Sequence, residues 1–151
     1  MKFVVAALLA TIPFTSAVAS EPTRTICKAG RKKNTDEVFG RVAINQRLNR
    51  KGNAKNAIVN QRWFYTEAGV EYQLSLCPSN DEASCCDPAS LSDSAPIGSA
   101  WTSGEDGSAA LREKVEGISV IGDDSAIGYW LQLTKTGGSD IEACCQIQER
   151  E

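Results

Sequence analysis

The residues that could do chemistry in this 151-residue chain are carboxylates, cysteines and cations, because histidine is absent. Without an imidazole, Ser-His-Asp and Cys-His relays, HExxH zinc sites and histidine acid–base catalysis are all excluded. Carboxylates occur in pairs at Asp81-Glu82, Glu105-Asp106 and Asp123-Asp124. Two carboxylates at a suitable separation can hydrolyse a glycosidic bond, and oxygen clusters can bind calcium. Adjacent acids in turns usually face water, and EF-hand spacing is missing, so we assign no catalytic residue, metal or cofactor.

The strongest candidate for recognition is the basic segment from Arg41 to Arg62. Its cations alternate with asparagines, so it offers point charges together with amide donors and acceptors that suit phosphate, sulfate or acidic protein surfaces. Its glycine and short polar spacers indicate a loop or frayed helix over Asn45–Asn56. Trp63-Phe64-Tyr65 follows, and strand alternation places at least one of these rings in the core. The predicted contact residues are Arg47, Arg50, Lys51, Lys55 and Arg62.

Charge is strongly segregated along the chain. Residues 24–62 hold eleven Lys or Arg against two Asp or Glu, whereas residues 63–151 hold four against sixteen. In one interpretation the basic part folds onto the acidic part and is neutralised; in the other it leaves an exposed basic face. The sequence leaves both open. The acidic remainder repels polyanions, which counts against nucleic acid as the partner.

The even number of cysteines is typical of three disulfides in an oxidising compartment. The six are Cys27, Cys77, Cys85, Cys86, Cys144 and Cys145. A bond between sequence neighbours closes a very small strained ring, and excluding such bonds leaves about ten of the fifteen possible pairings. Each vicinal pair is therefore expected to tie two different parts of the chain to one point. A thiolate metal site is the weaker alternative, because CxxC-like spacing is missing.

Residues 1–19 have the pattern of a signal peptide. Lys2 precedes an apolar stretch from Phe3 to Ile12, and small residues end in Ala17-Val18-Ala19. The polar residues and proline after Ile12 interrupt the stretch before the roughly 18–20 apolar residues that a membrane span needs. We therefore expect secretion, with residues 20–151 folding as a single extracellular cysteine-rich domain and no later membrane span.

Strict alternation of apolar and polar residues predicts a strand over Val70–Leu76, with Val70, Tyr72, Leu74 and Leu76 on its buried face. Ile58–Thr66 precedes it, and the intervening Glu67-Ala68-Gly69 predicts an antiparallel hairpin. A further strand is predicted over Val38–Ile44.

In the last third of the chain, turn sequences separate Gly117–Ile121, Ile127–Thr134 and Ile141–Gln148, which predicts a three-stranded meander. Ser108 as N-cap and Gly117 as the stop predict one short helix between them. The long polar stretch from Pro78 to Gly107 lacks periodicity, and we expect its cysteine pair to hold it in place.

Alternation along Ile127–Thr134 also places Trp130 on the opposite side of this strand from its apolar residues. We expect a helix or loop to cover this ring; the alternative is an exposed aromatic contact for sugar or protein.

Together these segments predict a mainly β fold: a disulfide-stabilised antiparallel sandwich or barrel of about six or seven short strands with one short helix. The alternative is an α+β fold in which the helix packs on an antiparallel sheet.

The combination of signal peptide, six cysteines and a small mature chain resembles the small secreted cysteine-rich proteins that microbes export, many of them effectors. This resemblance in size, cysteine content and signal peptide implies an effector-like binding protein that recognises an extracellular or host protein, or an anionic glycan, through its basic surface. One alternative is a carboxylate-dependent hydrolase of polysaccharide or nucleic acid, which requires a carboxyl group with a raised pKa in a cleft. The other is a toxin or antimicrobial protein, which lacks the support of a long cationic amphipathic helix.

Overall fold

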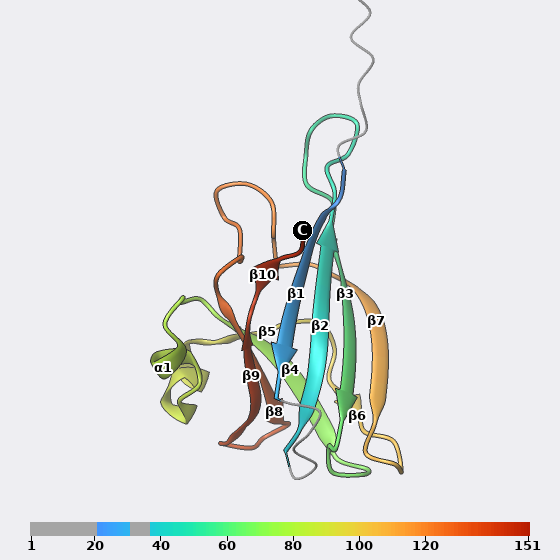
Figure 1. Ribbon diagram of the computed structural model, residues 1–151, viewed down its shortest axis with the longest axis vertical. Coiled ribbons are helices and arrows are strands. Elements are labelled where there is room, and N and C mark those ends of the chain that lie inside the picture. Colours follow the sequence, from blue (N-terminus) through green and yellow to red (C-terminus); the bar gives the residue numbers. More distant parts are fainter. Residues whose placement is uncertain (1–20, 31–36) are drawn as a thin grey trace, which may run out of the picture.

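The computed structural model describes residues 21–30 and 37–151, and its strands form two antiparallel sheets stacked face to face (Figure 1). The first sheet has the order β10-β1-β2-β3-β7. Its strands are β1 (Thr23–Ala29), β2 (Phe39–Gln46), β3 (Ala57–Phe64), β7 (Ala109–Val115) and β10 (Gln148–Glu149).

The second sheet has the order β5-β4-β8-β9, with β6 paired to β4. Its strands are β4 (Glu71–Cys77), β5 (Ala95–Pro96), β6 (Trp101–Thr102), β8 (Trp130–Lys135) and β9 (Ile141–Gln146). The helix α1 (Glu82–Cys85) and the 3-10 helix η1 (Pro88–Asp93) lie between β4 and β5. The prediction of a mainly β antiparallel sandwich with one short helix and three disulfides is confirmed, and seven of these strands have six or more residues.

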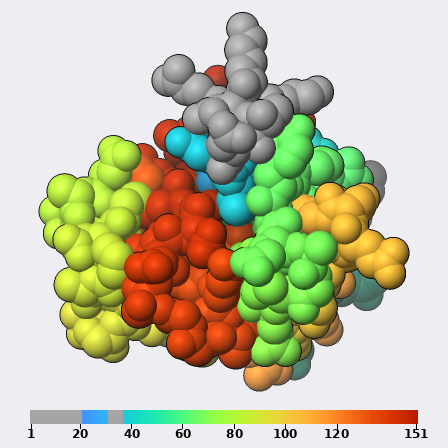
Figure 2. Space-filling model, turned by 90° about the horizontal axis from the view of Figure 1, so that it is seen from below, coloured from blue at the N-terminus to red at the C-terminus, as the bar shows by residue number. Residues whose placement is uncertain are grey.

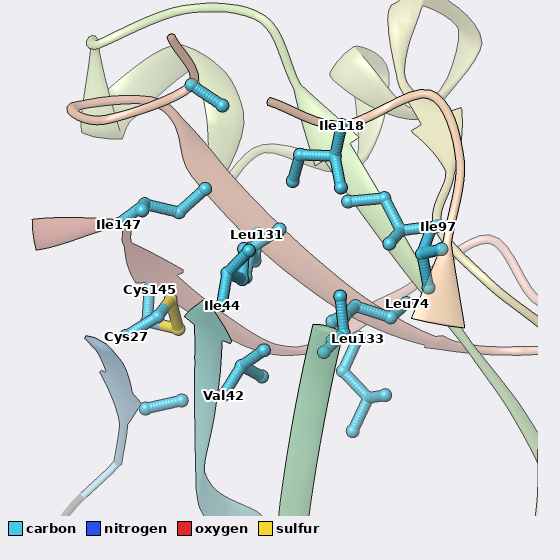
Figure 3. Packing of buried hydrophobic residues seen from close by; sticks show 14 of the residues in the cluster. Cys27, Val42, Ile44, Leu74, Ile97, Ile118, Leu131, Leu133, Cys145 and Ile147 are labelled. Carbon is cyan, nitrogen blue, oxygen red and sulfur yellow. A yellow bond between two sulfur atoms is a disulfide. The ribbon is translucent and has the colours of Figure 1, made fainter. Parts of the chain in front are cut away.

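Apolar side chains from both sheets meet in the space between them (Figure 3). Val42 and Ile44 of β2 and Leu131 and Leu133 of β8 are each 1% exposed or less. The predicted buried face of β4 is confirmed: Tyr72 and Leu74 are fully buried, while Val70 and Leu76 are half-buried and pack against the core. Burial of apolar surface between two sheets is the main force that stabilises such a sandwich.

The three disulfides form one continuous covalent path. Cys27–Cys145 joins β1 to β9 across the two sheets, Cys77–Cys85 joins β4 to α1, and Cys86–Cys144 joins the residue after α1 to β9. Each vicinal pair thus ties two parts of the chain to one point, as predicted. All six cysteines are used, so no thiolate is left for a metal.

The long polar segment after β4 is held against the second sheet, as predicted. Cys85 and Cys86 bond it to β4 and β9, and the buried Gln132 of β8 donates hydrogen bonds to the Cys85 carbonyl and the Ser90 hydroxyl. This cover explains why four successive residues, 131–134, are all buried. Trp130 is half-buried, and its indole nitrogen is enclosed.

The predicted helix between Ser108 and Gly117 is wrong, because this segment is the strand β7. Ala109 to Val115 pair residue by residue with β3, from Trp63 to Ala57. The spacing of Leu111 and Val115 fits one face of a helix and one face of a strand equally well. Pairing with the open edge of β3 satisfies the backbone and overrides the helix propensity of the sequence.

The predicted hairpin of Ile58–Thr66 with Val70–Leu76 is also wrong, because β3 and β4 belong to different sheets. The chain passes between the sheets through an arch, residues 65–70, in which the Tyr65 backbone has a positive φ of 59° and Thr66 is buried. The arch thus carries the chain from β3 in the first sheet to β4 in the second.

The predicted meander is wrong in its first member, since Gly117–Ile121 forms no strand. Ile118 and Val120 nevertheless enter the core. The other two members do pair, as β8 and β9.

No helix among residues 21–30 and 37–151 has the length and apolar character to cross a bilayer. The predicted signal peptide, residues 1–19, lies outside the described residues.

Candidate binding surface

The outward side of the first sheet carries a concentration of positive charge. Residues at alternate positions of β1, β2, β3 and β7 point away from the core, because most residues between them are buried in it or, on β7, half-buried against it. Six of the outward residues are exposed cations, which together we call the basic face: Arg24, Lys28, Arg41, Arg62, Arg112 and Lys114. None of the outward positions on these four strands holds Asp or Glu.

Strand register places three of these cations in one row. Lys28 of β1 lies opposite Arg41 of β2, and Arg41 lies opposite Arg62 of β3. Directly opposite residues in an antiparallel sheet have Cβ atoms about 4.5–5.5 Å apart, and like charges at that distance destabilise the pair. The row therefore opposes the stability of the sheet unless an anion lies over it.

Two neighbouring depressions on this side are lined by cations without a carboxylate. The larger, of about 820 Å³, is lined by Arg24, Arg47, Lys55, Arg112, Lys114 and Arg150, with Asn45 and Asn56 among the polar residues between them. The smaller, of about 450 Å³, is lined by Arg41, Arg62, Arg112 and Arg150. Arg150 follows β10, and its backbone N–H donates to the Arg24 carbonyl at 2.9 Å. The two depressions share Arg112 and Arg150 and so form one continuous basic surface.

The cations of this surface are not neutralised by the acidic part of the chain. In the part of the chain that the structure describes, ion pairs form only at Lys135, with Glu67 at 2.6 Å and Glu142 at 3.7 Å. All three residues belong to the acidic second part of the sequence. Of the two interpretations of the charge pattern, the described residues therefore agree with an exposed basic face.

The five predicted contact residues do not form one cluster. Arg47 and Lys55 meet at the base of the β2–β3 loop, where the Lys55 N–H donates to the Arg47 carbonyl at 2.9 Å. Arg62 lies on the same side of the sheet, but seven residues, or about 23 Å of extended strand, away from Lys55. Arg50 and Lys51 lie at the exposed tip of the loop, beyond the end of the sheet.

The segment that carries this tip is a hairpin loop and not a frayed helix. Leu48 and Ala54 form a bridge across it, and the Asn49 side chain accepts hydrogen bonds from the N–H groups of Lys51 and Asn53.

Several members of the basic surface were missed by the sequence reasoning. Arg24 and Lys28 alternate with Thr25 and Cys27, a period of two that could have marked β1 as a strand with a basic side. Arg112 and Lys114 of β7 were missed because a helix over this segment would point them in different directions around its axis, whereas the strand places both on one side of the sheet. Arg150 is brought to the surface by β10, a strand of two residues without a sequence pattern of its own.

A cluster of three aromatic rings, which we call the aromatic platform, adjoins the basic face. It consists of Phe39, Phe64 and Tyr65. Phe39 lies directly opposite Phe64, and their rings stack with centroids 4.8 Å apart; the centroids of Phe39 and Tyr65 are 5.4 Å apart. Phe64 and Tyr65 are 37% and 49% exposed, whereas Trp63 is buried, which confirms that one ring of the Trp-Phe-Tyr run enters the core.

The paired carboxylates at 81–82, 105–106 and 123–124 are exposed in loops or at the start of α1. Hydrogen bonds from the Ser108 side chain and backbone hold the pKa of Asp106 below its usual range. The Ser99 backbone N–H and hydroxyl do the same to the pKa of Glu113. A hydrolytic general acid needs a shift in the opposite direction. Within the described ranges, no group of three or more cysteine, aspartate or glutamate side chains is arranged to hold a metal ion.

Comparison of the chain with protein-family models and with curated proteins finds no match. Its function must therefore be argued from the charged and aromatic surface described above.

Proposed function

We propose that this protein is a secreted, disulfide-stabilised binding protein that holds an anionic extracellular partner on the basic face. The observation that carries the proposal is the row of unneutralised cations Lys28, Arg41 and Arg62 across three adjacent strands. Effector-like action, in which the partner belongs to a host or to a cell surface, is the biological setting that we propose for this binding.

An anion on the row contributes binding energy in two ways. It attracts each cation, and it removes the repulsion between neighbouring cations that the free protein must bear. The cations stand on paired strands of a disulfide-linked sandwich, so the surface does not have to be ordered when the partner binds. Guanidinium groups also suit this role because their planar forks bind carboxylate, sulfate and phosphate oxygens in pairs.

Three further findings support an extracellular setting. All six cysteines are in disulfides, which persist in oxidising compartments. The described helices include none that could span a membrane. The sequence pattern of residues 1–19 is typical of a cleaved export signal.

The test compares two double variants that change the same residue types. In Lys28→Gln/Arg41→Gln the cationic row is broken, whereas Arg50→Gln/Lys51→Gln removes one lysine and one arginine from the loop tip. Binding of the oxidised protein, residues 20–151, to heparin is measured by titration calorimetry from low to physiological salt. We expect wild-type affinity to fall steeply with salt, the row variant to bind about tenfold more weakly at each salt concentration, and the tip variant to change affinity less than about threefold.

Equal losses in the two variants would mean that net charge alone attracts heparin, and that the basic face has no special part. Absence of wild-type binding at low salt would overturn the proposal altogether.

A further inference from the structure

We infer that the aromatic platform is a subsite for a sugar ring, and that the partner of the basic face is an acidic polysaccharide. This inference rests on the proposed function and names the chemical class of its ligand. In such a complex the rings of Phe64 and Tyr65 stack on the apolar face of a sugar, while the neighbouring arginines hold its carboxylate or sulfate groups.

Register links the platform directly to the cations. Phe39 and Phe64 form one cross-strand pair, and the next outward pair along the same two strands is Arg41 and Arg62. Two residues of extended strand separate these pairs by about 6.6 Å. A pyranose ring on the platform can therefore present its acidic group, or that of the next sugar, to a guanidinium group.

The exposed ring of Tyr65 is held in an unusual backbone conformation. Its φ of 59° lies in the left-handed region, which an aromatic residue rarely adopts. Thr66, the next residue, is buried, and its N–H and hydroxyl both donate to the Gly107 carbonyl, at 3.0 and 2.8 Å. The Glu67 N–H donates to the Tyr72 hydroxyl at 2.8 Å.

These bonds fix the arch on the side of Tyr65 that leads into β4. Strained residues held in this way, with a side chain that does not pack in the core, occur at ligand-binding sites.

The surroundings of the platform favour a polysaccharide over nucleic acid. A depression of about 480 Å³ beside Tyr65 is lined by four carboxylates and one lysine: Glu37, Glu67, Asp140, Glu142 and Lys135. Figure 2 looks onto this end of the molecule, where the green β3–β4 arch lies beside the orange-red β8–β9 turn. Lys135, the ion-pair partner of Glu67, is the last residue of β8 before this turn.

Carboxylates repel a chain that bears a phosphate on every nucleotide. The same carboxylates accept hydrogen bonds from sugar hydroxyl groups, and the Lys135 ammonium group can donate hydrogen bonds to the hydroxyl oxygens. A polymer with many hydroxyls and fewer charges fits both the basic row and this acidic neighbour.

The test removes the rings without removing charge. Phe64→Ser/Tyr65→Asn deletes both exposed rings and places at position 65 a residue that tolerates positive φ. Phe64→Tyr/Tyr65→Phe is the control that keeps both rings. Each protein is titrated with hyaluronan, which has many hydroxyl groups and one carboxylate per disaccharide, with inorganic polyphosphate, which has charge but no ring, and with single-stranded polyuridylate. Near-ultraviolet circular dichroism, to which the buried Trp63 and Trp101 contribute, confirms that each variant is folded.

We expect the ring-deleted variant to bind hyaluronan about tenfold more weakly and polyphosphate within about twofold of wild type, while the control binds both like wild type. Absence of wild-type binding to hyaluronan, an unchanged hyaluronan affinity, an equal loss with polyphosphate, or a larger loss with polyuridylate than with hyaluronan would each overturn the inference. If the row variant Lys28→Gln/Arg41→Gln still loses heparin binding in these cases, the proposed function survives and only the sugar subsite fails. If wild type binds neither these three polymers nor heparin, both fail.

Discussion

Gly40 of β2 lies directly opposite Trp63 of β3, on the side of the first sheet that faces the core. A Cβ atom on Gly40 would collide with the Trp63 ring and lie 2.5 Å from the Arg62 carbonyl oxygen. Trp63 is 1% exposed, and its indole N–H donates to the Gln61 side chain at 3.0 Å. The missing side chain at position 40 therefore makes the space that this fully buried tryptophan occupies.

Replacing this glycine should disturb the core directly. We expect Gly40→Ala to lower the free energy of unfolding by about 1–3 kcal/mol, because the added methyl group overpacks a site with no free volume. Urea denaturation followed by tryptophan fluorescence measures the change. Gly104→Ala is the control, since its Cβ meets its nearest neighbours at 3.2 Å on an exposed turn. A cost as small for Gly40→Ala as for the control would show that Trp63 can move aside.

Glu113 links stability to pH at the scale of a single side chain. The Ser99 N–H and hydroxyl donate to its two carboxylate oxygens at 3.0 and 2.7 Å and hold its pKa below the usual glutamate range. A pKa that is lower in the folded state stabilises the protein above the unfolded-state value, and this contribution disappears as the pH falls through the folded-state value.

We therefore expect Glu113→Gln to lose a few tenths of a kcal/mol at pH 7, a small effect because the group is open to solvent, and this deficit to shrink as the pH falls through the folded-state pKa. Urea denaturation over a series of pH values from 7 downward checks the difference. A deficit that stays the same at every pH would assign the effect to lost packing.

At the scale of strands, the cationic row costs stability that a single substitution should restore. Arg41 has a like charge opposite it on both sides, Lys28 on β1 and Arg62 on β3. We expect Arg41→Gln to raise the free energy of unfolding by about 0.2–1 kcal/mol at low salt, and this gain to shrink in 1 M salt, where charges are screened. Thermal or urea denaturation at the two salt concentrations measures it, with Arg50→Gln at the loop tip as the control. A gain in the free energy of unfolding of the same size at both salt concentrations would contradict the electrostatic explanation.

The disulfides should contribute unequally to stability. With the other two bonds intact, the shortest covalent path from Cys27 to Cys145 runs through about 50 residues, from Cys27 to Cys77. The Cys77–Cys85 bond closes a segment with a sequence separation of 8. In the chain-entropy account, removal of Cys27–Cys145 by paired serine substitutions costs about 4 kcal/mol and removal of Cys77–Cys85 about 2.5 kcal/mol. Denaturation of the two serine variants gives the order, and the reverse order would show that local packing outweighs loop entropy.

The elements show where sequence reasoning succeeds and where it stops. The strand Glu71–Cys77 could be predicted because its alternation is strict and its apolar residues do enter the core. The strand Ala109–Val115 could not, because its apolar spacing fits two structures, and the pairing with β3 that decides between them is a contact between distant segments. The arch after β3 has the local sequence of a hairpin turn, and nothing local reveals which sheet the next strand will join.

For the whole molecule, the charge separation of the sequence becomes a separation in space. The cations of the first part face outward on β1, β2 and β3, and sequence reasoning could foresee an excess of charge there. It could not foresee that β7 and Arg150, which come from the acidic part, would complete the surface. That required the order of the strands in the sheet, which long-range pairing determines.

The Cys27–Cys145 bond also decides how the molecule would respond to mechanical load. Force applied at Glu21 and Glu151 reaches Cys27 and Cys145 after a few residues and then passes through the bond between them. The intervening chain, with a sequence separation of 118, carries no tension. Pulling the oxidised protein with optical tweezers should release only the short terminal segments. Reduction of this bond alone should expose a further contour length of about 170 Å, because the other two disulfides keep the covalent path between Cys27 and Cys145 at about 50 residues, so the length gained on unfolding reports directly on its redox state.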